Sequence, residues 1–119
     1  MKHTFLLLII ICQHQTLIGQ TIPLDSAKFY EGKTITICSK VIDTYVSKHE
    51  DETTFINFGK PYPNNSFTVV IYAKDLDNFK YSPTNYLKGK VICITGKITI
   101  YKDKPQMIVE GEEAVKIEK

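Results

Sequence analysis

The chain contains nearly the same ten residues twice. "GKTITICSKV" occupies residues 32–41, and "GKVICITGKI" occupies residues 89–98. Both alternate isoleucine with threonine or cysteine, a pattern of period two that is typical of a half-buried β-strand. The alternation places Cys38 and Cys93 on the face opposite the isoleucines. The repeat therefore predicts two similar strands, and a chance resemblance between two β-rich segments is the alternative.

The same period marks further strands along the chain. "AKDLDNF" at residues 73–79 breaks the pattern and predicts a short helix, because Leu76 and Phe79 lie one turn apart. Pro83 is expected to end any helix before it. The acidic tail after residue 110 either adds a short element or frays. The predicted strands cover residues 34–46 with a bulge after Ser39-Lys40, 53–58, 66–72, 90–101 and 106–110.

Five strands with one short helix between the third and the fourth is the order of an OB-fold. This all-β fold is a five-stranded, partly open Greek-key barrel. Its first and fourth strands are antiparallel neighbours that both curve to close the barrel, which explains the repeated decapeptide. The small residues Ser39 and Gly96 stand where such strands need a bulge or a kink.

The N-terminus predicts a signal peptide over residues 1–20, followed by a single OB-fold domain over 21–119 with its barrel core at about 33–111. The apolar run Phe5–Ile11 follows a basic start and is far shorter than the roughly 20 residues of a membrane span. We place cleavage beside Gly19 or Gln20 and expect a periplasmic or secreted protein. A lipid anchor on Cys12 is the alternative, but Ile11 stands where lipidation sites carry a small residue.

The amino-acid composition excludes few classes of binding partner. The 119 residues carry a formal net charge of +2, which neither requires nor excludes nucleic acid. Every basic residue is lysine, so bidentate recognition of phosphates or base edges by arginine is excluded.

Three stretches resemble a known group of domains: "ICSKVIDTYVS", "TTFINFGKPYPNNSFTVVIYAKDL" and "YLKGKVICITGKITIYKDKPQMIVE". They are similar to OB-fold nucleic-acid-binding-type domains of small exported bacterial proteins, which are also found appended to secreted thermonuclease-like enzymes. The resemblance covers residues 34–110, and its most specific part is Asn57-Phe58-Gly59 with Tyr62-Pro63 and Phe67-Thr68. It implies the fold and a single-stranded nucleic-acid ligand, although OB-folds also bind oligosaccharides and proteins.

OB-folds bind ligands on the outer face of the second and third strands, between the loops that join strands one to two and four to five. Stacking aromatics and lysines near that face are the candidate contacts. Three alternatives stay open: Phe55 in the core with reversed parity, Tyr62 as a plug rather than a lid, and the lysines as a solvated edge. The candidates are Phe55, Asn57, Lys60, Tyr62, Thr68, Tyr72, Lys97, Tyr101, Lys102 and Lys104.

The loop His49–Glu52 places three carboxylates where a phosphate chain would pass, and it suits a cation or a basic protein partner instead. His49 is the only histidine after the predicted signal peptide, and no nucleophile elbow, phosphate-cradling glycine loop or Cys-x-x-Cys pair is present. We therefore expect a protein without catalytic activity, cofactor or metal.

Cys38 and Cys93 lie on strands predicted to be neighbours, and exported proteins meet an oxidising compartment. A disulfide between them is one interpretation, and two unpaired thiols are the other.

Two functions follow from these residues. The first is a non-catalytic module that binds single-stranded DNA or RNA in an exported setting. The second is an exported OB-fold stress or stability domain that binds a cation, a glycan or a protein partner. A nuclease encoded elsewhere could act beside either, and the oligomeric state stays open.

Overall fold

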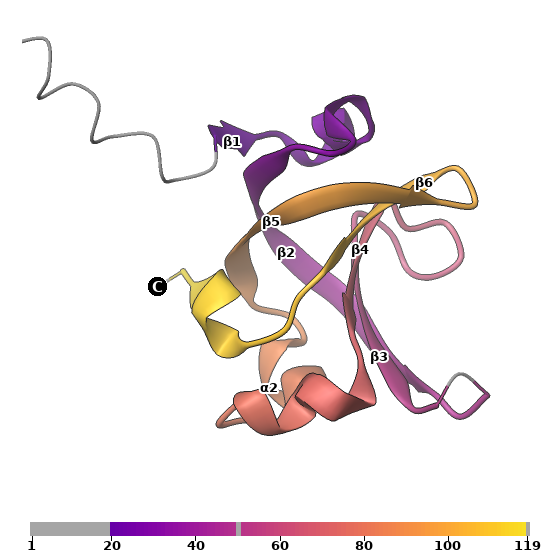
Figure 1. Ribbon diagram of the computed structural model, residues 1–119, viewed down its shortest axis with the longest axis vertical. Coiled ribbons are helices and arrows are strands. Elements are labelled where there is room, and N and C mark those ends of the chain that lie inside the picture. The colour runs from indigo at the N-terminus through magenta and orange to yellow at the C-terminus, as the bar shows by residue number, and fades with distance from the viewer. Residues whose placement is uncertain (1–19, 50, 119) are drawn as a thin grey trace, which may run out of the picture.

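The alternating segments pair into one continuous ring of strands in the computed structural model, which describes residues 20–49 and 51–118 (Figure 1). Short strands and helices flank this ring. In chain order the elements are β1 (Gln20–Ile22), η2 (Leu24–Tyr30), β2 (Thr34–Ser47), β3 (Thr53–Phe58), β4 (Phe67–Ile71), η3 (Ala73–Asn78), α2 (Pro83–Leu87), β5 (Val91–Tyr101), β6 (Lys104–Ile108), η4 (Glu112–Ala114) and β7 (Val115–Ile117). The η elements are 3₁₀ helices.

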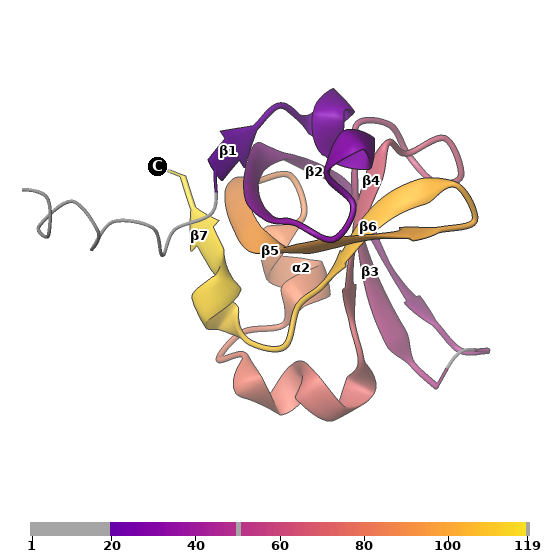
Figure 2. The same cartoon turned by 45° about the horizontal axis from the view of Figure 1, so that its top comes forward.

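The ring runs β2-β3-β4-β6-β5 and closes where β5 pairs with β2 (Figures 1 and 2). The β4–β6 pair is parallel, and the other four pairs of the ring are antiparallel. The short helices η3 and α2 lie between β4 and β5 in the chain. This is the five-stranded Greek-key barrel of the OB-fold, so the predicted fold class is confirmed.

The repeated decapeptides are the antiparallel neighbours β2 and β5, as predicted. Their register places Cys38 opposite Cys93, with Cα atoms 3.9 Å apart, and a disulfide joins the two side chains. Thr36 and Thr95 form the next outward pair and share a hydrogen bond of 2.7 Å between their hydroxyl groups. A covalent bond and a hydroxyl pair therefore fasten the strands that close the barrel.

A bulge in β2 lies between Val41 and Asp43, two residues beyond the predicted position. Before it, the odd-numbered residues Ile35 and Ile37 point into the barrel and are buried. Because the bulge adds one residue, the odd-numbered residues after it point out of the barrel, and Asp43 lies on the outer face. The other small residue, Gly96, allows close packing: a Cβ there would lie 2.8 Å from Cγ of Met107.

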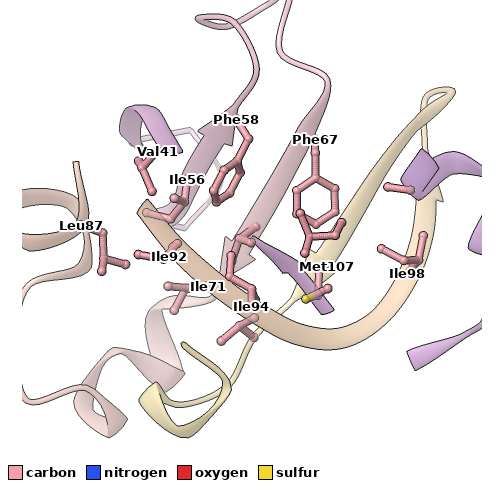
Figure 3. Close-up of a cluster of buried hydrophobic side chains, with 14 of the residues drawn as sticks. Val41, Ile56, Phe58, Phe67, Ile71, Leu87, Ile92, Ile94, Ile98 and Met107 are labelled. Atoms are coloured by element: carbon pink, nitrogen blue, oxygen red, sulfur yellow. The ribbon is translucent and has the colours of Figure 1, made fainter. Parts of the chain in front are cut away.

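Inward-facing side chains from all five barrel strands fill the interior (Figure 3). Each fully buried large apolar side chain contributes about 1.5–3 kcal/mol relative to leaving it exposed. Leu87 of α2 joins this cluster and closes one end of the barrel. The largest side chains are Phe58, Phe67, Ile35, Ile37, Ile56, Ile71, Leu87, Ile92, Ile94, Ile98, Met107 and Val41.

Three details differ from the sequence-based expectation. The segment between β4 and β5 holds two helices, and Pro83 begins the second of them because Ser82 caps it and proline fits the first helical turn. The last barrel strand, β6, begins at Lys104 rather than at residue 106 and ends at Ile108. The elements β1 and η2 were not anticipated. The acidic tail adds short elements, one of its two predicted alternatives: it forms η4 and β7, and β7 pairs with β5.

No helix among the described residues is long and apolar enough to cross a membrane. The predicted signal peptide and the alternative lipid site at Cys12 lie outside the described residues, except for Gln20, which begins β1.

Candidate nucleic-acid interface

A groove of about 1530 Å³ runs over the outer face of β3, β4 and β6. His49 and Asp51, from the connection between β2 and β3, flank it on one side, and the β5–β6 hairpin flanks it on the other. Figures 1 and 2 show the β2–β3 and β5–β6 hairpins projecting from the same side of the barrel. Pockets for drug-sized ligands enclose roughly 300–1,000 Å³. The groove is larger than that and suits an extended ligand.

One row of apolar side chains crosses the strands beneath this groove. Tyr45 of β2 stands opposite Phe55 of β3, which stands opposite Val70 of β4. Ile108 of β6 extends this row beyond the residues that line the groove. The rings of Tyr45 and Phe55 stack with centroids 6.3 Å apart and planes 23° apart. Tyr45 is 54% exposed, so its ring is available to a ligand.

A second, polar row lies beside the first. Asp43, Asn57, Thr68 and Gln106 stand opposite one another on β2, β3, β4 and β6. The Asn57 amide donates a 2.9 Å hydrogen bond to Oδ1 of Asp43, and its oxygen accepts one of 2.9 Å from the Thr68 hydroxyl. The buried amide of Asn65 donates to both Asn57 and Thr68, at 3.1 Å and 2.5 Å. Three members of the row are therefore committed to one another.

This polar network also positions the loop that carries Tyr62. The backbone N–H of Tyr62 donates a 3.3 Å hydrogen bond to Oδ2 of Asp43, so both carboxylate oxygens of Asp43 accept hydrogen bonds. The ammonium of Lys104 donates to the carbonyl oxygen of Pro63 from the other side. Tyr62 itself is 72% exposed, so it belongs to the rim and is not a plug.

Two lysines lie at the hairpin end of the groove, and a third, Lys74, follows β4 at the other end and forms a 3.3 Å ion pair with Asp75. The β5–β6 hairpin turns on Lys102 and Asp103, whose φ angles of 50° and 67° are those of a tight two-residue hairpin turn. Lys102, Lys104 and Lys74 all line the groove. The Lys102 ammonium lies 5.3 Å from the centre of the Tyr101 ring, which also lines it.

The loop between β2 and β3 brings His49 and Asp51 to the other side of the groove. No group of three or more His, Cys, Asp or Glu side chains that could hold a metal ion occurs in the described ranges. The groove therefore combines a lysine-rich hairpin with a mildly acidic opposite wall.

Eight of the ten predicted contact residues line this groove. Phe55 lies on the outer face, as the favoured parity predicted, and Asn57 is only 2% exposed, so it acts within the polar network. Lys60 and Lys97 do not line the groove: Lys97 pairs with Thr34 on the disulfide-bonded side of the barrel. The eight are Phe55, Asn57, Tyr62, Thr68, Tyr72, Tyr101, Lys102 and Lys104.

Sequence reasoning missed Tyr45, Asp43, Lys74 and Gln106, which also line the groove. Simple alternation from Ile37 assigns Tyr45 to the interior, and only the bulge after Val41 turns it outward. The signal for Gln106 was available, because it alternates with the buried Pro105 and Met107.

Comparison with known proteins supports the fold. No protein-family model and no curated protein matches the chain in sequence. A chain assigned as an aspartyl-tRNA synthetase of Leishmania major Friedlin is similar in structure, with a TM-score of 0.54, 9% identity and 88% of this chain covered. An asparaginyl-tRNA synthetase of Pyrococcus horikoshii has a TM-score of 0.55, 8% identity and 81% of this chain covered. The match covers 22% of each synthetase chain, and at this identity it shows that the chain shares a fold with part of those enzymes.

Proposed function

We propose that this protein is a non-catalytic module that binds single-stranded DNA or RNA in the groove. The observation that carries the proposal is the combination, in one groove of an OB barrel, of the stacked pair Tyr45 and Phe55 with lysines on the β5–β6 hairpin. Sequence-tolerant binders of single strands combine such aromatic platforms with positive charges that follow the phosphate backbone.

Each part of the groove has a role in this proposal. Bases stack on the exposed face of Tyr45 and on Tyr72 and Tyr101, which are 39% and 54% exposed. Phosphates pass Lys102 and Lys104 on the hairpin, with Lys74 at the start of η3 as a third cation. Lysine contacts a phosphate as a point charge, so these residues provide affinity without sequence preference.

The proposal includes no catalysis. Asp43, the carboxylate on the groove floor, is held by hydrogen bonds from Asn57 and Tyr62 to both of its oxygens. In this proposal the Asp43 carboxylate has a structural role, since it holds Asn57 and the backbone of Tyr62 in place.

The proposal also includes export, to the periplasm or beyond, as a single domain after removal of the predicted signal peptide. The Cys38–Cys93 disulfide supports this setting, because disulfides persist mainly in oxidising compartments. The resemblance to exported bacterial domains points the same way. Nuclease or protein partners would be additional to the groove ligand.

A second candidate ligand is an oligosaccharide. Asp51 and His49 line the wall opposite the lysines, and carboxylates beside exposed aromatic rings suit sugar hydroxyl groups better than phosphates. Salt separates the two ligands, since only the phosphate contacts release counterions.

Fluorescence anisotropy with labelled single-stranded DNA and RNA of about 15 nucleotides tests the proposal. We expect saturable binding at about 50 mM salt, weakened by Tyr72→Ala and unchanged by Lys97→Ala, whose side chain is outside the groove. Absence of oligonucleotide binding at low salt by the folded, disulfide-bonded protein would exclude the nucleic-acid ligand. Saturable binding of neutral oligosaccharides in the same assay would then favour the second candidate.

A further inference from the structure

The loop 59–66 joins β3 to β4, and its backbone is tied to two further strands at neighbouring residues. The backbone N–H of Tyr62 donates a 3.3 Å hydrogen bond to Oδ2 of Asp43 on β2. The carbonyl oxygen of Pro63 accepts a hydrogen bond from the ammonium of Lys104 on β6. Figures 1 and 2 show the loop beside the β5–β6 hairpin. The backbone at Tyr62 is therefore held on both sides without any contribution from its ring.

The polar network connects the same loop to Asp43 a second time. The buried amide of Asn65, near the end of the loop, donates to the side-chain oxygen of Asn57, which also accepts from the Thr68 hydroxyl. The Asn57 nitrogen therefore faces Asp43 and donates to Oδ1. Both hydrogen bonds at Asp43 thus need an acceptor, and a carboxylate has two acceptor oxygens. A side-chain amide in its place would turn an N–H toward one of the two donors.

The Tyr62 ring projects from this fixed loop into solvent. It is 72% exposed and lines the groove. A group that is fixed before the ligand arrives loses less conformational freedom on binding, so it contributes more to affinity than a mobile group does. An exposed ring held at the rim of the groove is suited to stack on a base whose other face lies toward the floor.

The charge of Asp43 works against the proposed ligand. A carboxylate in a groove for single-stranded nucleic acid repels the phosphates, so on charge alone the groove would bind more tightly without it. Its presence is explained by the two hydrogen bonds that it accepts, one of which fixes the backbone of Tyr62. Charge and positioning therefore predict opposite effects when this carboxylate is replaced by an amide.

We infer, on the basis of the proposed nucleic-acid function, that Asp43 is the positioning residue of the groove. It holds the loop 59–66 so that the Tyr62 ring covers a base bound on the floor. Asp43 itself makes no contact with the ligand and acts through Tyr62. Loss of the carboxylate should therefore weaken binding even though it removes a repulsive charge.

The first test compares Asp43→Asn with Asp51→Asn in anisotropy titrations with a thymine oligonucleotide of about 15 nucleotides. Asp51 is the matched control, because it lines the same groove and makes no hydrogen bond to the loop 59–66 within the described residues. Asparagine also tolerates the positive φ of 55° at that position. We expect Asp51→Asn to bind at least as tightly as the wild-type protein and Asp43→Asn to bind more weakly.

A double-mutant cycle tests whether Asp43 acts through Tyr62. Tyr62→Ala alone should weaken binding roughly 5- to 150-fold, the loss of one stacking platform. Asp43→Asn should weaken binding by at most that factor in the wild-type protein and cause no further loss in the Tyr62→Ala variant. Thermal melts identify the folded variants. Asn65→Ala, which removes the second tie of the loop, replaces Asp43→Asn in the cycle if the latter does not fold.

Three results overturn the inference and leave the proposed function intact. They are an affinity of Asp43→Asn equal to or above that of the wild-type protein, a wild-type affinity of Tyr62→Ala, and losses that add in the double variant. Absence of oligonucleotide binding by the folded wild-type protein overturns both the inference and the proposed function.

Discussion

Single residues divide the groove into parts that contact a ligand and parts that hold the floor. Tyr45 and Phe55 stack on neighbouring strands, and Tyr45 keeps more than half of its surface exposed. Asn57 looks like a ligand contact from its alternation, yet it is almost fully buried and bonds to Asp43. Replacing an exposed aromatic should therefore change binding, whereas replacing Asn57 should change stability.

Tyr45→Ala should weaken binding of single-stranded oligonucleotides by about 1–3 kcal/mol, or roughly 5- to 150-fold, because one stacking platform is lost. Tyr86→Ala is the control, since Tyr86 is also an exposed aromatic, 43% exposed, but lies on α2 outside the groove. Anisotropy titrations of both variants measure the difference. Equal affinities of the two variants would show that Tyr45 is not a platform.

Tyr81 gives the fold a dependence on alkaline pH. Burial raises the pKa of its hydroxyl above the ordinary value of 10.0, and the nearby Glu112 and Tyr86 raise it further. The folded state therefore retains the proton more strongly than the unfolded chain does. This contribution is fully present below pH 10.0, and it is lost as the pH rises through the higher pKa of the folded state.

We expect the free energy of unfolding of the wild-type protein to fall more steeply between about pH 9 and pH 12 than that of Tyr81→Phe. Urea denaturation at a series of pH values measures both slopes. Phenylalanine keeps the ring contacts with Phe79 and Tyr86, so the variant removes the titrating group alone. Parallel slopes would contradict the assignment.

At the scale of elements, the sequence predicted the barrel strands and missed the additions around them. Each barrel strand buries one face, so alternation located β3 at its observed bounds and β2, β4 and β5 within two residues. β1 has only three residues, too few for a periodic signal. α2 could have been recognised from Ser82-Pro83, because the Ser82 hydroxyl accepts a hydrogen bond from the N–H of Asn85 at the helix start.

The position of the groove on the barrel could be predicted from the sequence, but the full set of side chains that line it could not. The patterns of β3 and β4 favoured the outer face for Phe55 and Thr68 but left the reverse parity of Phe55 open, and the strand pairing decides for the outer face. Which β2 side chains face the groove depends on the bulge between Val41 and Asp43. This bulge lies two residues beyond its predicted position, and the residue types around it do not reveal that difference. The position of Lys97 on the far side followed from the barrel register, which no local pattern contains.

Loss of the disulfide should destabilise the barrel without altering the groove. The bond joins residues 55 positions apart, and in the chain-entropy model a loop of this length corresponds to about 4 kcal/mol. The Cys38→Ser, Cys93→Ser double variant should unfold at a correspondingly lower urea concentration. Its affinity for oligonucleotides, measured well below the unfolding transition, should match the wild-type value because neither cysteine lines the groove. Unchanged stability would contradict the role of the bond.

At the scale of the molecule, the positions of the charged residues in the fold matter more for ligand binding than the net charge. The sequence carries 15 lysines and 13 acids, and its formal net charge is only +2. The barrel nevertheless places Lys102 and Lys104 together at one end of the groove, where their fields act on a polyanion, and Lys74, paired with Asp75, at the other end. Lysines on other faces, such as Lys97, contribute little at distances beyond the screening length of about 8–10 Å.

Salt dependence should therefore report three phosphate contacts. For a single strand the slope is about −0.7 per contact, so affinity should fall roughly 20-fold between about 50 mM and about 200 mM salt. The Lys102→Ala, Lys104→Ala double variant should reduce that loss to roughly 3-fold, and Lys97→Ala should leave it unchanged. Identical slopes in all three proteins would place the phosphate contacts elsewhere.

The described chain starts in β1 and finishes just after β7, and these strands form the two outer edges of the sheet that contains the disulfide. Neither strand supplies a residue to the groove. A tag, an immobilisation linker or a second domain fused at either end would thus leave from a remote face of the barrel. The same geometry allows the barrel to be built into a longer polypeptide, as similar barrels are in the synthetases, with its groove still open to solvent.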